Sequence, residues 1–318
     1  MTALKLPSGP GVEERLELPA ASCCSSHSSA LGLGGVMAAA GADGVSVIEG
    51  AACEPEVVST ADFLRTLGVK IEGDGSPTIR IEGVGQDGFA SLGGVSFTIP
   101  PDRIETGTYI LAGAAAGGRV EVRNCRPKDN LALLSILKNI GVPLEIGEDS
   151  VTVTGVDQVT PCDVATLAYP GFPTDLQGPL MALLCKTDGV SLITEKIFPD
   201  RFMHLSELRR FGAKVRKEGS TGIIEGGAPL HGAEVMASDL RASACLVIAG
   251  LIASGTTQVR RIYHLQRGYE SMEVKLRGLG ADVERVGRDR GLRIRQRRRW
   301  LARHPRYSLP PPRPWHHN

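Results

Sequence analysis

The sequence has few aromatic residues and no strong charge of either sign. Aromatic residues make up 4% of its 318 residues, and the formal net charge is +1. A balanced charge gives no global attraction to nucleic acid or to an anionic membrane, so any function that depends on charge must be local. Glycine is abundant, with 39 copies. This composition is typical of short strands, tight turns and closely packed helices around an aliphatic core.

The seven cysteines form no pattern that would hold a metal or predict disulfides. The sequence has no C-x-x-C pair and no cluster of histidines, which favours a reducing compartment and predicts no metal site. The longest apolar stretch, 246–253, is far shorter than the roughly 18 residues that span a bilayer. The first forty residues are not a cationic start followed by an apolar run. We therefore expect a cytoplasmic protein, with a plastid location as the weaker alternative.

A pattern of an apolar residue, a glycine and a small residue recurs four times, about seventy residues apart. Each glycine follows a helix-like segment and is expected to end that helix as its C′ residue. The four glycines are Gly68, Gly141, Gly212 and Gly280. One β-rich run lies about twenty residues before each glycine and another directly follows it. The expected strands are 45–48, 70–71, 120–122, 144–146, 191–193, 214–216, 257–259 and 282–286.

A further helix is expected before the unit in the last three copies. These helices begin near Asp102, Asp175 and Asp239, and they are apolar nearly all round, which indicates burial inside the fold.

The register of the repeats divides the chain into four parts. Residues 1–35 match no unit and stay unassigned, with disorder as one interpretation. Residues 36–87 form a single isolated unit, and residues 88–286 form a set of three. Residues 287–318 are expected to be a disordered tail rich in arginine and proline, with an arm that binds RNA or a membrane surface as the alternative.

Arginines near the predicted helix starts indicate an anion site. Helix N-termini carry a partial positive charge, and three that converge would attract an anion. Arg241 lies beside Asp239, Arg267 lies in the third copy of the set, and Arg201 occupies the matching place one repeat earlier. Forked guanidinium donors suit a phosphate or a carboxylate. The alternative is that these arginines join the repeats by pairing with Asp200, Asp239 and Glu270.

Asp175 is the candidate general base of the site. It follows Pro170 and Pro173, which make the approach to the helix start rigid. Its carboxylate could act as a general base or accept a hydrogen bond from a sugar hydroxyl. The alternative is that Asp175 caps the N-terminus of the helix.

Several long motifs resemble the UDP-N-acetylglucosamine 1-carboxyvinyltransferases. Two of them are Ile-Phe-Pro-Asp-Arg-Phe-Met-His at 197–204 and Ser-Asp-Leu-Arg-Ala-Ser-Ala at 238–244. The others are 47–56, 101–107, 169–177 and 261–270. The resemblance covers residues 36–286, and its motifs differ from those of the sister enzyme that makes 5-enolpyruvylshikimate-3-phosphate, although the two share a fold.

The resemblance implies an α/β fold, an inside-out α/β barrel of repeated βαβαββ units around buried helices. One domain is near-complete, and one unit of the second domain remains. The family transfers the enolpyruvyl group of phosphoenolpyruvate to the 3-hydroxyl of UDP-N-acetylglucosamine, the first committed step of peptidoglycan synthesis. It uses no metal and no organic cofactor, and no nucleic-acid or membrane partner is expected.

The resemblance also assigns roles to residues of this chain. Asp175 would be the base on the sugar hydroxyl, and Ile197 a backbone contact to the nucleotide-sugar. Arg241 and Arg267 would hold the carboxylate or phosphate of phosphoenolpyruvate. Arg201 and Asp239 would support the cleft.

The chain departs from the family in its first part. The Lys-Asn pair that grips phosphoenolpyruvate and the loop that carries the acid catalyst have no recognisable counterpart, and Cys23 and Cys24 lie in no version of that loop. We therefore expect an N-terminally truncated transferase that is inactive alone and that pairs with a missing N-terminal half or a full-length homologue. The alternatives are a non-catalytic fragment that binds a UDP-sugar or another protein, and an artefact of the gene model.

Overall fold

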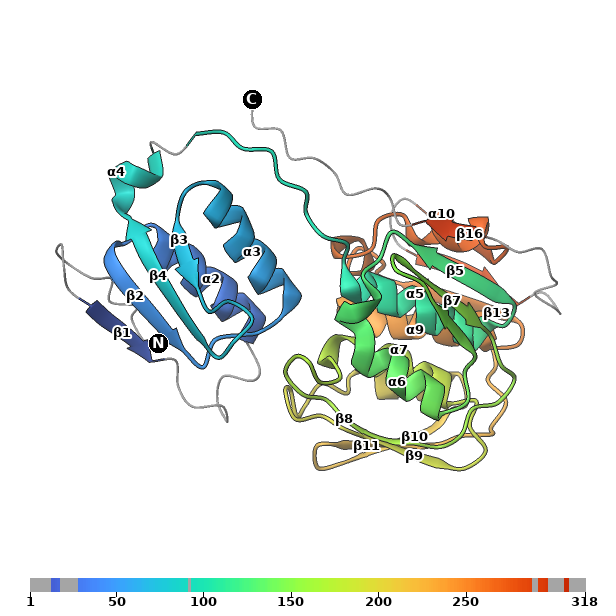
Figure 1. Ribbon diagram of the computed structural model, residues 1–318. Coiled ribbons are helices and arrows are strands. Elements are labelled where there is room, and N and C mark those ends of the chain that lie inside the picture. Colours follow the sequence, from blue (N-terminus) through green and yellow to red (C-terminus); the bar gives the residue numbers. More distant parts are fainter. Residues whose placement is uncertain (1–12, 18–27, 91–92, 288–290, 297–305, 309–318) are drawn as a thin grey trace. The chain divides into compact units, whose positions relative to one another are not determined.

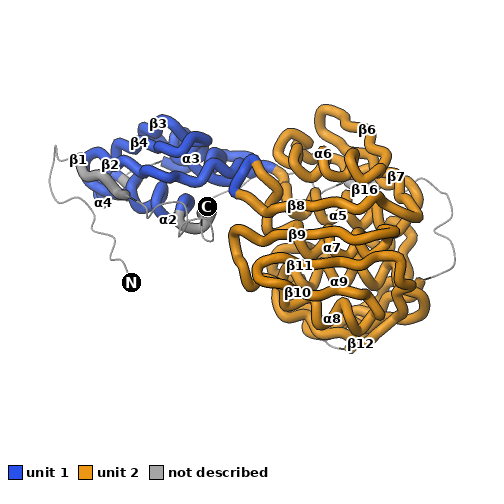
Figure 2. Tube along the Cα trace, turned by 90° about the horizontal axis from the view of Figure 1, so that it is seen from below, with its two compact units in different colours: residues 1–100, 168–170, 312–318 blue, residues 101–167, 171–311 orange. Residues whose placement is uncertain are grey.

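The computed structural model describes residues 13–17, 28–90, 93–287, 291–296 and 306–308 (Figure 1). The chain forms two compact units (Figure 2). Of the described residues, 13–17, 28–90, 93–100 and 168–170 belong to unit 1, and 101–167, 171–287, 291–296 and 306–308 belong to unit 2.

Unit 1 is built as strand, helix, strand, helix and two further strands. Its elements are β1 (Glu13–Glu17), α2 (Ser28–Ala40), β2 (Asp43–Glu49), α3 (Pro55–Thr66), β3 (Lys70–Glu72) and β4 (Thr78–Val84), followed by the short helix α4 (Gly85–Ala90). The sheet order is β1-β2-β4-β3, with β1 parallel to β2. Unit 1 is therefore one βαβαββ repeat.

Unit 2 contains three copies of this repeat. The first holds α5 (Arg103–Ala116), β5 (Arg119–Arg123), α6 (Leu131–Asn139), β6 (Leu144–Ile146) and β7 (Ser150–Thr154). The second holds β8 (Asp163–Ala165), α7 (Gln177–Leu184), β9 (Val190–Thr194), α8 (His204–Arg210), β10 (Lys214–Glu218) and β11 (Thr221–Glu225). The third holds β12 (Glu234–Met236), α9 (Leu240–Ile252), β13 (Thr256–Arg260), α10 (Met272–Gly278), β14 (Asp282–Val286) and β15 (Gly291–Arg295).

The three sheets of unit 2 repeat the strand order of unit 1. The orders are β8-β9-β11-β10, β12-β13-β15-β14 and β16-β5-β7-β6. In the last sheet β16 (Arg306–Ser308) pairs in parallel with β5, which is the place that β8 and β12 hold in the other two copies. The sheet of the second copy lies across the buried helices (Figure 2). The enolpyruvyl transferase fold expected from the sequence is confirmed.

The four repeat glycines end the second helix of each copy, as the sequence predicts. Gly68, Gly141, Gly212 and Gly280 follow α3, α6, α8 and α10, with φ angles of +102°, +89°, +91° and +96°. These angles lie in the left-handed region, which glycine adopts without steric cost. Each glycine therefore turns the chain out of a helix and into the next strand.

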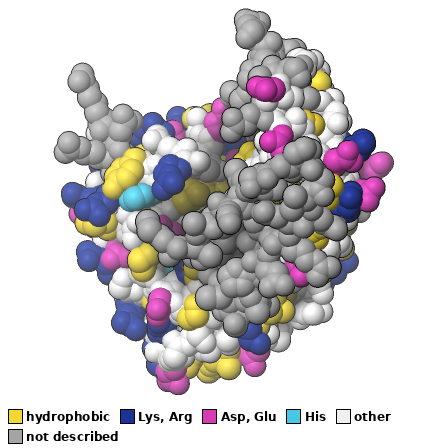
Figure 3. Space-filling view, turned by 90° about the vertical axis from the view of Figure 1, so that its left-hand side faces the viewer, with side chains coloured by type: hydrophobic (Ala, Val, Ile, Leu, Met, Phe, Trp, Pro, Cys, Tyr) yellow, Lys and Arg dark blue, Asp and Glu magenta, His cyan; other side chains and the backbone are white. Residues whose placement is uncertain are grey.

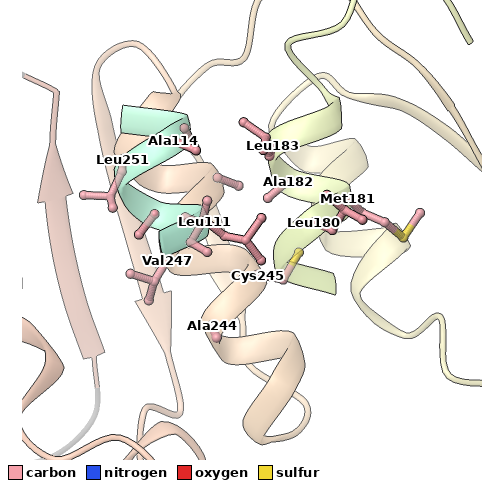
Figure 4. Packing of buried hydrophobic residues seen from close by; sticks show 14 of the residues in the cluster. Leu111, Ala114, Leu180, Met181, Ala182, Leu183, Ala244, Cys245, Val247 and Leu251 are labelled. Atoms are coloured by element: carbon pink, nitrogen blue, oxygen red, sulfur yellow. The ribbon is translucent and has the colours of Figure 1, made fainter. Parts of the chain in front are cut away.

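The helices α5, α7 and α9 pack against one another and form the centre of unit 2. Their contacting side chains are small or aliphatic, such as Leu111 and Ala114 on α5, Leu180 on α7, and Ala244 and Val247 on α9 (Figure 4). Each helix is buried nearly all round. Because the sides of these three helices are covered by neighbouring helices and sheets, only the helix ends can carry a polar site.

Residues 1–35 differ from the expectation where they are described. Strand β1 and the start of helix α2 lie in this range and complete the repeat of unit 1. The first copy therefore also has the additional helix that the sequence indicated only for the other three. Glycines at positions 32, 34 and 35 lower the helix propensity of α2, so the helical pattern is weak in the sequence.

The expected boundaries at 88 and 287 also differ from the structure. Unit 2 begins at Pro101. Strand β15 lies inside the proposed tail, where Leu292 and Ile294 are buried and alternate with Arg293 and Arg295. Both arginines pair with Glu284 of β14, at 2.6 and 2.8 Å. The arginines at 293 and 295 therefore belong to an ordinary half-buried strand, and their number made this segment resemble a disordered tail in the sequence. Residues 297–305 and 309–318 of that tail lie outside the described residues.

Acidic and basic side chains of the described residues are interspersed on the face shown in Figure 3. Among the helices that the structure describes, none combines the length and apolar character needed to cross a membrane.

Gly113 of α5 provides a test of the helix packing. A Cβ atom there would lie 2.7 Å from Val153 Cγ1 and 3.1 Å from Val120 Cβ. Both valines are stiff strand residues, so we expect Gly113→Ala to lower the free energy of unfolding by about 1 to 3 kcal/mol. Gly278→Ala is the control, since nothing lies within 4 Å of a Cβ at that position. Urea unfolding of both variants checks this, and a Gly113→Ala protein as stable as the parent would contradict the packing argument.

Candidate functional site

The candidate site lies where the N-terminal ends of the three buried helices meet. Asp102 and Asp239 cap α5 and α9 by accepting hydrogen bonds from two backbone N–H groups each. The corresponding acid before α7 behaves differently. Asp175 lies in a short 3-10 helix, η2 (Thr174–Leu176), and its side chain caps no helix. The capping alternative for Asp175 is therefore wrong, and its carboxylate is available for other contacts.

The carboxylate of Asp175 is bound by two arginines. Arg201 Nη1 donates to Oδ1 at 2.8 Å, and Arg241 Nη2 donates to Oδ2 at 2.8 Å. Burial raises the pKa of Asp175, but the two guanidinium groups outweigh burial and hold the pKa below the ordinary value of 3.8. The carboxylate is thus ionised and held in a fixed orientation. We call these three residues the Asp175 clamp.

The Arg201 end of the clamp rests on a buried acid, Glu195, which is 1% exposed. Arg201 Nη1 also donates to Thr174 Oγ1 at 3.0 Å, and the Thr174 hydroxyl donates to Glu195 Oε2 at 2.8 Å. Glu195 Oε1 accepts hydrogen bonds from the Thr166 hydroxyl and from the backbone N–H groups of residues 197 and 198. Glu195 therefore fixes both the loop that carries Arg201 and the threonine beside Asp175.

The Arg241 end of the clamp rests on Tyr269. Arg241 Nη1 donates to the Tyr269 hydroxyl at 3.2 Å, and the Arg241 Cζ atom lies 5.8 Å from the centre of the tyrosine ring. The Tyr269 hydroxyl lies 2.9 Å from Thr108 Oγ1 on α5. This contact joins the third copy of the repeat to the first.

The other predicted site residues do not join the clamp. Asp239 caps α9 through the backbone N–H groups of Arg241 and Ala242, at 2.8 and 2.9 Å. The backbone N–H of Ile197 donates to Glu195 Oε1 at 2.9 Å. Arg267 is exposed at the end of the 3-10 helix η3 (Leu265–Arg267), and within the described part of the chain its guanidinium forms no ion pair.

The alternative interpretation paired the arginines with acids such as Asp200 and Asp239, and the structure gives Arg201 and Arg241 a different partner. Asp200 pairs with Lys217 at 2.6 Å, and Asp239 serves as a cap. Both arginines bind Asp175 instead. Arg241 and Asp175 come from different repeats, so this pair does connect copies, but through an acid at the convergence of the helices.

His204, the first residue of α8, is a buried histidine. It is 4% exposed, and its Nε2 atom lies 3.2 Å from Met181 Sδ. Burial lowers the pKa of His204 from 6.5 to about 4, an effect that Asp239 opposes and Arg201 supports. His204 is therefore neutral near pH 7 and adds no charge to the site.

A cavity of about 350 Å³ lies at the opposite, C-terminal ends of the same helices. Ala116, Lys186 and Ile252 are among the residues that line it. The Lys186 ammonium donates to the Ala115 carbonyl at 2.8 Å and to the carbonyl of Val156. It therefore neutralises a helix C-terminus, and the cavity is separate from the Asp175 clamp. No group of three or more His, Cys, Asp or Glu side chains suited to a metal occurs among the described residues.

Comparison with known proteins places this geometry in a family. The model of the EPSP synthase family (3-phosphoshikimate 1-carboxyvinyltransferase) matches residues 10–276. The chain belongs to this family. Solved structures agree, since the enolpyruvyl transferase NikO from Streptomyces tendae matches 84% of this chain and 64% of its own with a TM-score of 0.72 and 27% identity. An EPSP synthase from Acinetobacter baumannii shares the fold, at 23% identity and a TM-score of 0.54 over 68% of this chain and 50% of its own.

Closer relatives in sequence carry a more specific name. The UDP-N-acetylglucosamine 1-carboxyvinyltransferase of Geotalea uraniireducens is 50% identical over 251 residues, which are 79% of this chain and 59% of the relative. That of Xylella fastidiosa is 51% identical over 253 residues, 79% of this chain and 58% of the relative. The chain thus spans less than two thirds of the length of these relatives.

The pKa of His204 predicts how stability responds to acid. The unfolded chain binds a proton near pH 6.5, whereas the folded chain does so only near pH 4. The contribution of neutral His204 to the stability of the folded chain is therefore fully present above pH 6.5. As the pH falls toward 4, this contribution is lost, and the free energy of unfolding decreases by about 3 kcal/mol. We expect His204→Gln to flatten this part of the profile of unfolding free energy against pH, and His231→Gln, at an exposed histidine, to leave it unchanged. Equal slopes in the His204→Gln variant and the parent would contradict the assignment.

Proposed function

We propose that the chain carries the part of an enolpyruvyl transferase site that binds the sugar hydroxyl and the anionic substrate. In its working form it would transfer the enolpyruvyl group of phosphoenolpyruvate to the 3-hydroxyl of UDP-N-acetylglucosamine, for peptidoglycan synthesis. The observation that carries the proposal is the Asp175 carboxylate held by Arg201 and Arg241 where three helix N-termini converge. The names of the relatives at about 50% identity support the choice of substrates.

The clamp offers a way to couple substrate binding to base strength. The two guanidinium groups keep the pKa of Asp175 low. A phosphoenolpyruvate carboxylate or phosphate bound to Arg241 would offset part of the positive charge that acts on Asp175. The pKa of Asp175 then rises, and the carboxylate becomes a stronger base when the anion is in place. It can then take the proton of the sugar hydroxyl as the hydroxyl oxygen attacks C2 of phosphoenolpyruvate, while the acid catalyst of the second polypeptide would protonate C3. Loss of a proton from C3 together with phosphate in the later elimination would restore the double bond.

Two other residues complete the proposed substrate contacts. Arg267 is exposed and would supply a second guanidinium for phosphoenolpyruvate. The carbonyl of Ile197, held in place because Glu195 binds the N–H of the same residue, would accept a hydrogen bond from the nucleotide-sugar.

The proposal includes a second polypeptide, either a family N-terminal half or a full-length homologue, that supplies the Lys-Asn pair and the acid catalyst. The alternative is a non-catalytic fragment that binds a UDP-sugar. A cytoplasmic location is also proposed, since the described cysteines are free thiols.

A phosphate-release assay separates these functions. We expect negligible turnover by the chain alone, and release that depends on the UDP-sugar once the N-terminal half of a relative is added, within the usual enzyme range of about 1 to 1,000 per second. Isothermal titration with the UDP-sugar is run beside it. Binding without turnover under both conditions would favour the non-catalytic alternative, and absence of binding and turnover would reject the proposal.

Arg→Lys changes test whether the arginines bind substrate. Lysine keeps the charge but loses the forked pair of donors. In the complemented enzyme, Arg241→Lys and Arg267→Lys should each weaken phosphoenolpyruvate use at least tenfold, about 1.4 kcal/mol, with little change in UDP-sugar binding. Arg277→Lys, at an exposed arginine of α10, is the control. Unaltered kinetics in both site variants would remove these two arginines from the substrate site.

A further inference from the structure

Tyr269 occupies a buried position between two copies of the repeat. It is 1% exposed, and burial raises the pKa of its phenol, so the hydroxyl keeps its proton at neutral pH. Its oxygen contacts one charged group, Arg241, and one neutral group, Thr108.

The direction of each hydrogen bond in this chain of groups is fixed. The single hydroxyl proton of Thr108 is donated to the Ile104 carbonyl at 2.8 Å. The Tyr269 hydroxyl must therefore donate its own proton to Thr108 Oγ1, at 2.9 Å. Its oxygen is then left to accept from Arg241 Nη1, at 3.2 Å. This series of hydrogen bonds ends on the Ile104 carbonyl of α5. Reversing the direction of any one of them would therefore break a hydrogen bond.

These hydrogen bonds restrain the orientation of the Arg241 guanidinium. Arg241 Nη2 is bound to Asp175, and Arg241 Nη1 is bound to Tyr269. A guanidinium held at both of its terminal nitrogens is restrained about the Nε–Cζ bond and about the side-chain torsions before it, whereas one held at a single nitrogen can pivot about that contact. Such pivoting would move the forked donors away from the direction in which an anion approaches. A half-turn about Nε–Cζ only exchanges Nη1 and Nη2, and its rate reports how firmly the two nitrogens are held.

We propose that Tyr269 is a positioning residue for Arg241, which it holds through its hydroxyl against Thr108 so that the guanidinium faces an incoming carboxylate or phosphate. The consequence for catalysis rests on the proposed function. The orientation of Arg241 does not, and it can be measured without substrate.

Tyr269→Phe is the matched variant, because it keeps the ring that lies beside the Arg241 guanidinium and removes only the hydroxyl. The first measurement is the rate of rotation about the Nε–Cζ bond of Arg241, read from nitrogen exchange in NMR spectra of the full chain. We expect rotation at least tenfold faster in Tyr269→Phe than in the parent. Tyr263→Phe, at a tyrosine that is 51% exposed, is the control and should leave the rate unchanged. An unchanged rate in Tyr269→Phe overturns the proposal.

The second measurement is phosphoenolpyruvate affinity in the complemented enzyme, arranged as a double-mutant cycle. If Tyr269 acts through Arg241, Tyr269→Phe weakens binding about fivefold or more in the parent and has little further effect when Arg241 is already lysine. The same change stays additive with Arg267→Lys. Effects of Tyr269→Phe that add equally to both lysine variants indicate a general structural role and overturn the proposal. A parent that fails to bind phosphoenolpyruvate rejects the proposed function, and the rotation rate still decides the role of Tyr269.

Thr108 supplies a second pair of variants if Tyr269→Phe does not fold. Thr108→Val removes the acceptor for the Tyr269 proton, and Thr108→Ser retains it. We expect faster rotation of Arg241 in Thr108→Val and recovery of the parent rate in Thr108→Ser. Equal rates in the two variants overturn the proposal.

Discussion

The ion pairs of Asp175 with Arg201 and Arg241 determine how the polar end of unit 2 is arranged. Three helix N-termini and two guanidinium groups bring positive charge to one place. Asp102 and Asp239 cap two of the helices, and Asp175 is the carboxylate that pairs with both guanidinium groups. Arg201 belongs to the same copy as Asp175, and Arg241 to the next. Without the carboxylate, the two arginines would repel each other in a half-buried setting.

The junction between the third copy and the first determines how accurately Arg241 is placed. Lys275 of α10 donates to Glu105 of α5 at 2.6 Å, with both side chains nearly buried. The contact of Tyr269 with Thr108 crosses the same junction. The other contacts between central helices are mainly apolar, and apolar packing is less directional than hydrogen bonding. The polar contacts between the third copy and the first therefore fix side-chain orientations that the aliphatic core alone would leave free.

Most of the fold could be predicted because the same glycine motif ends a helix in every copy of the repeat. Gly68, Gly141, Gly212 and Gly280 each need a left-handed backbone, and that need marks the same turn in every copy. The weak points have physical causes. Helix α2 contains glycines that obscure its pattern, and β15 alternates apolar residues with arginines whose partners lie on β14. The pairing of β16 with β5 could not be predicted, because its partner is almost 200 residues away in the chain.

The site was less predictable because equivalent residues of a repeat can have different roles. Asp102, Asp175 and Asp239 stand at matching helix starts, and from spacing alone each is a cap. Two of them are caps. At Asp175 the chain enters α7 through a 3-10 turn, so the backbone N–H groups that a cap would bind are not presented to its side chain. The carboxylate then binds arginines instead. A repeat fold can thus keep two copies of a position as helix caps and give the third a different set of contacts, with a change of backbone over three residues.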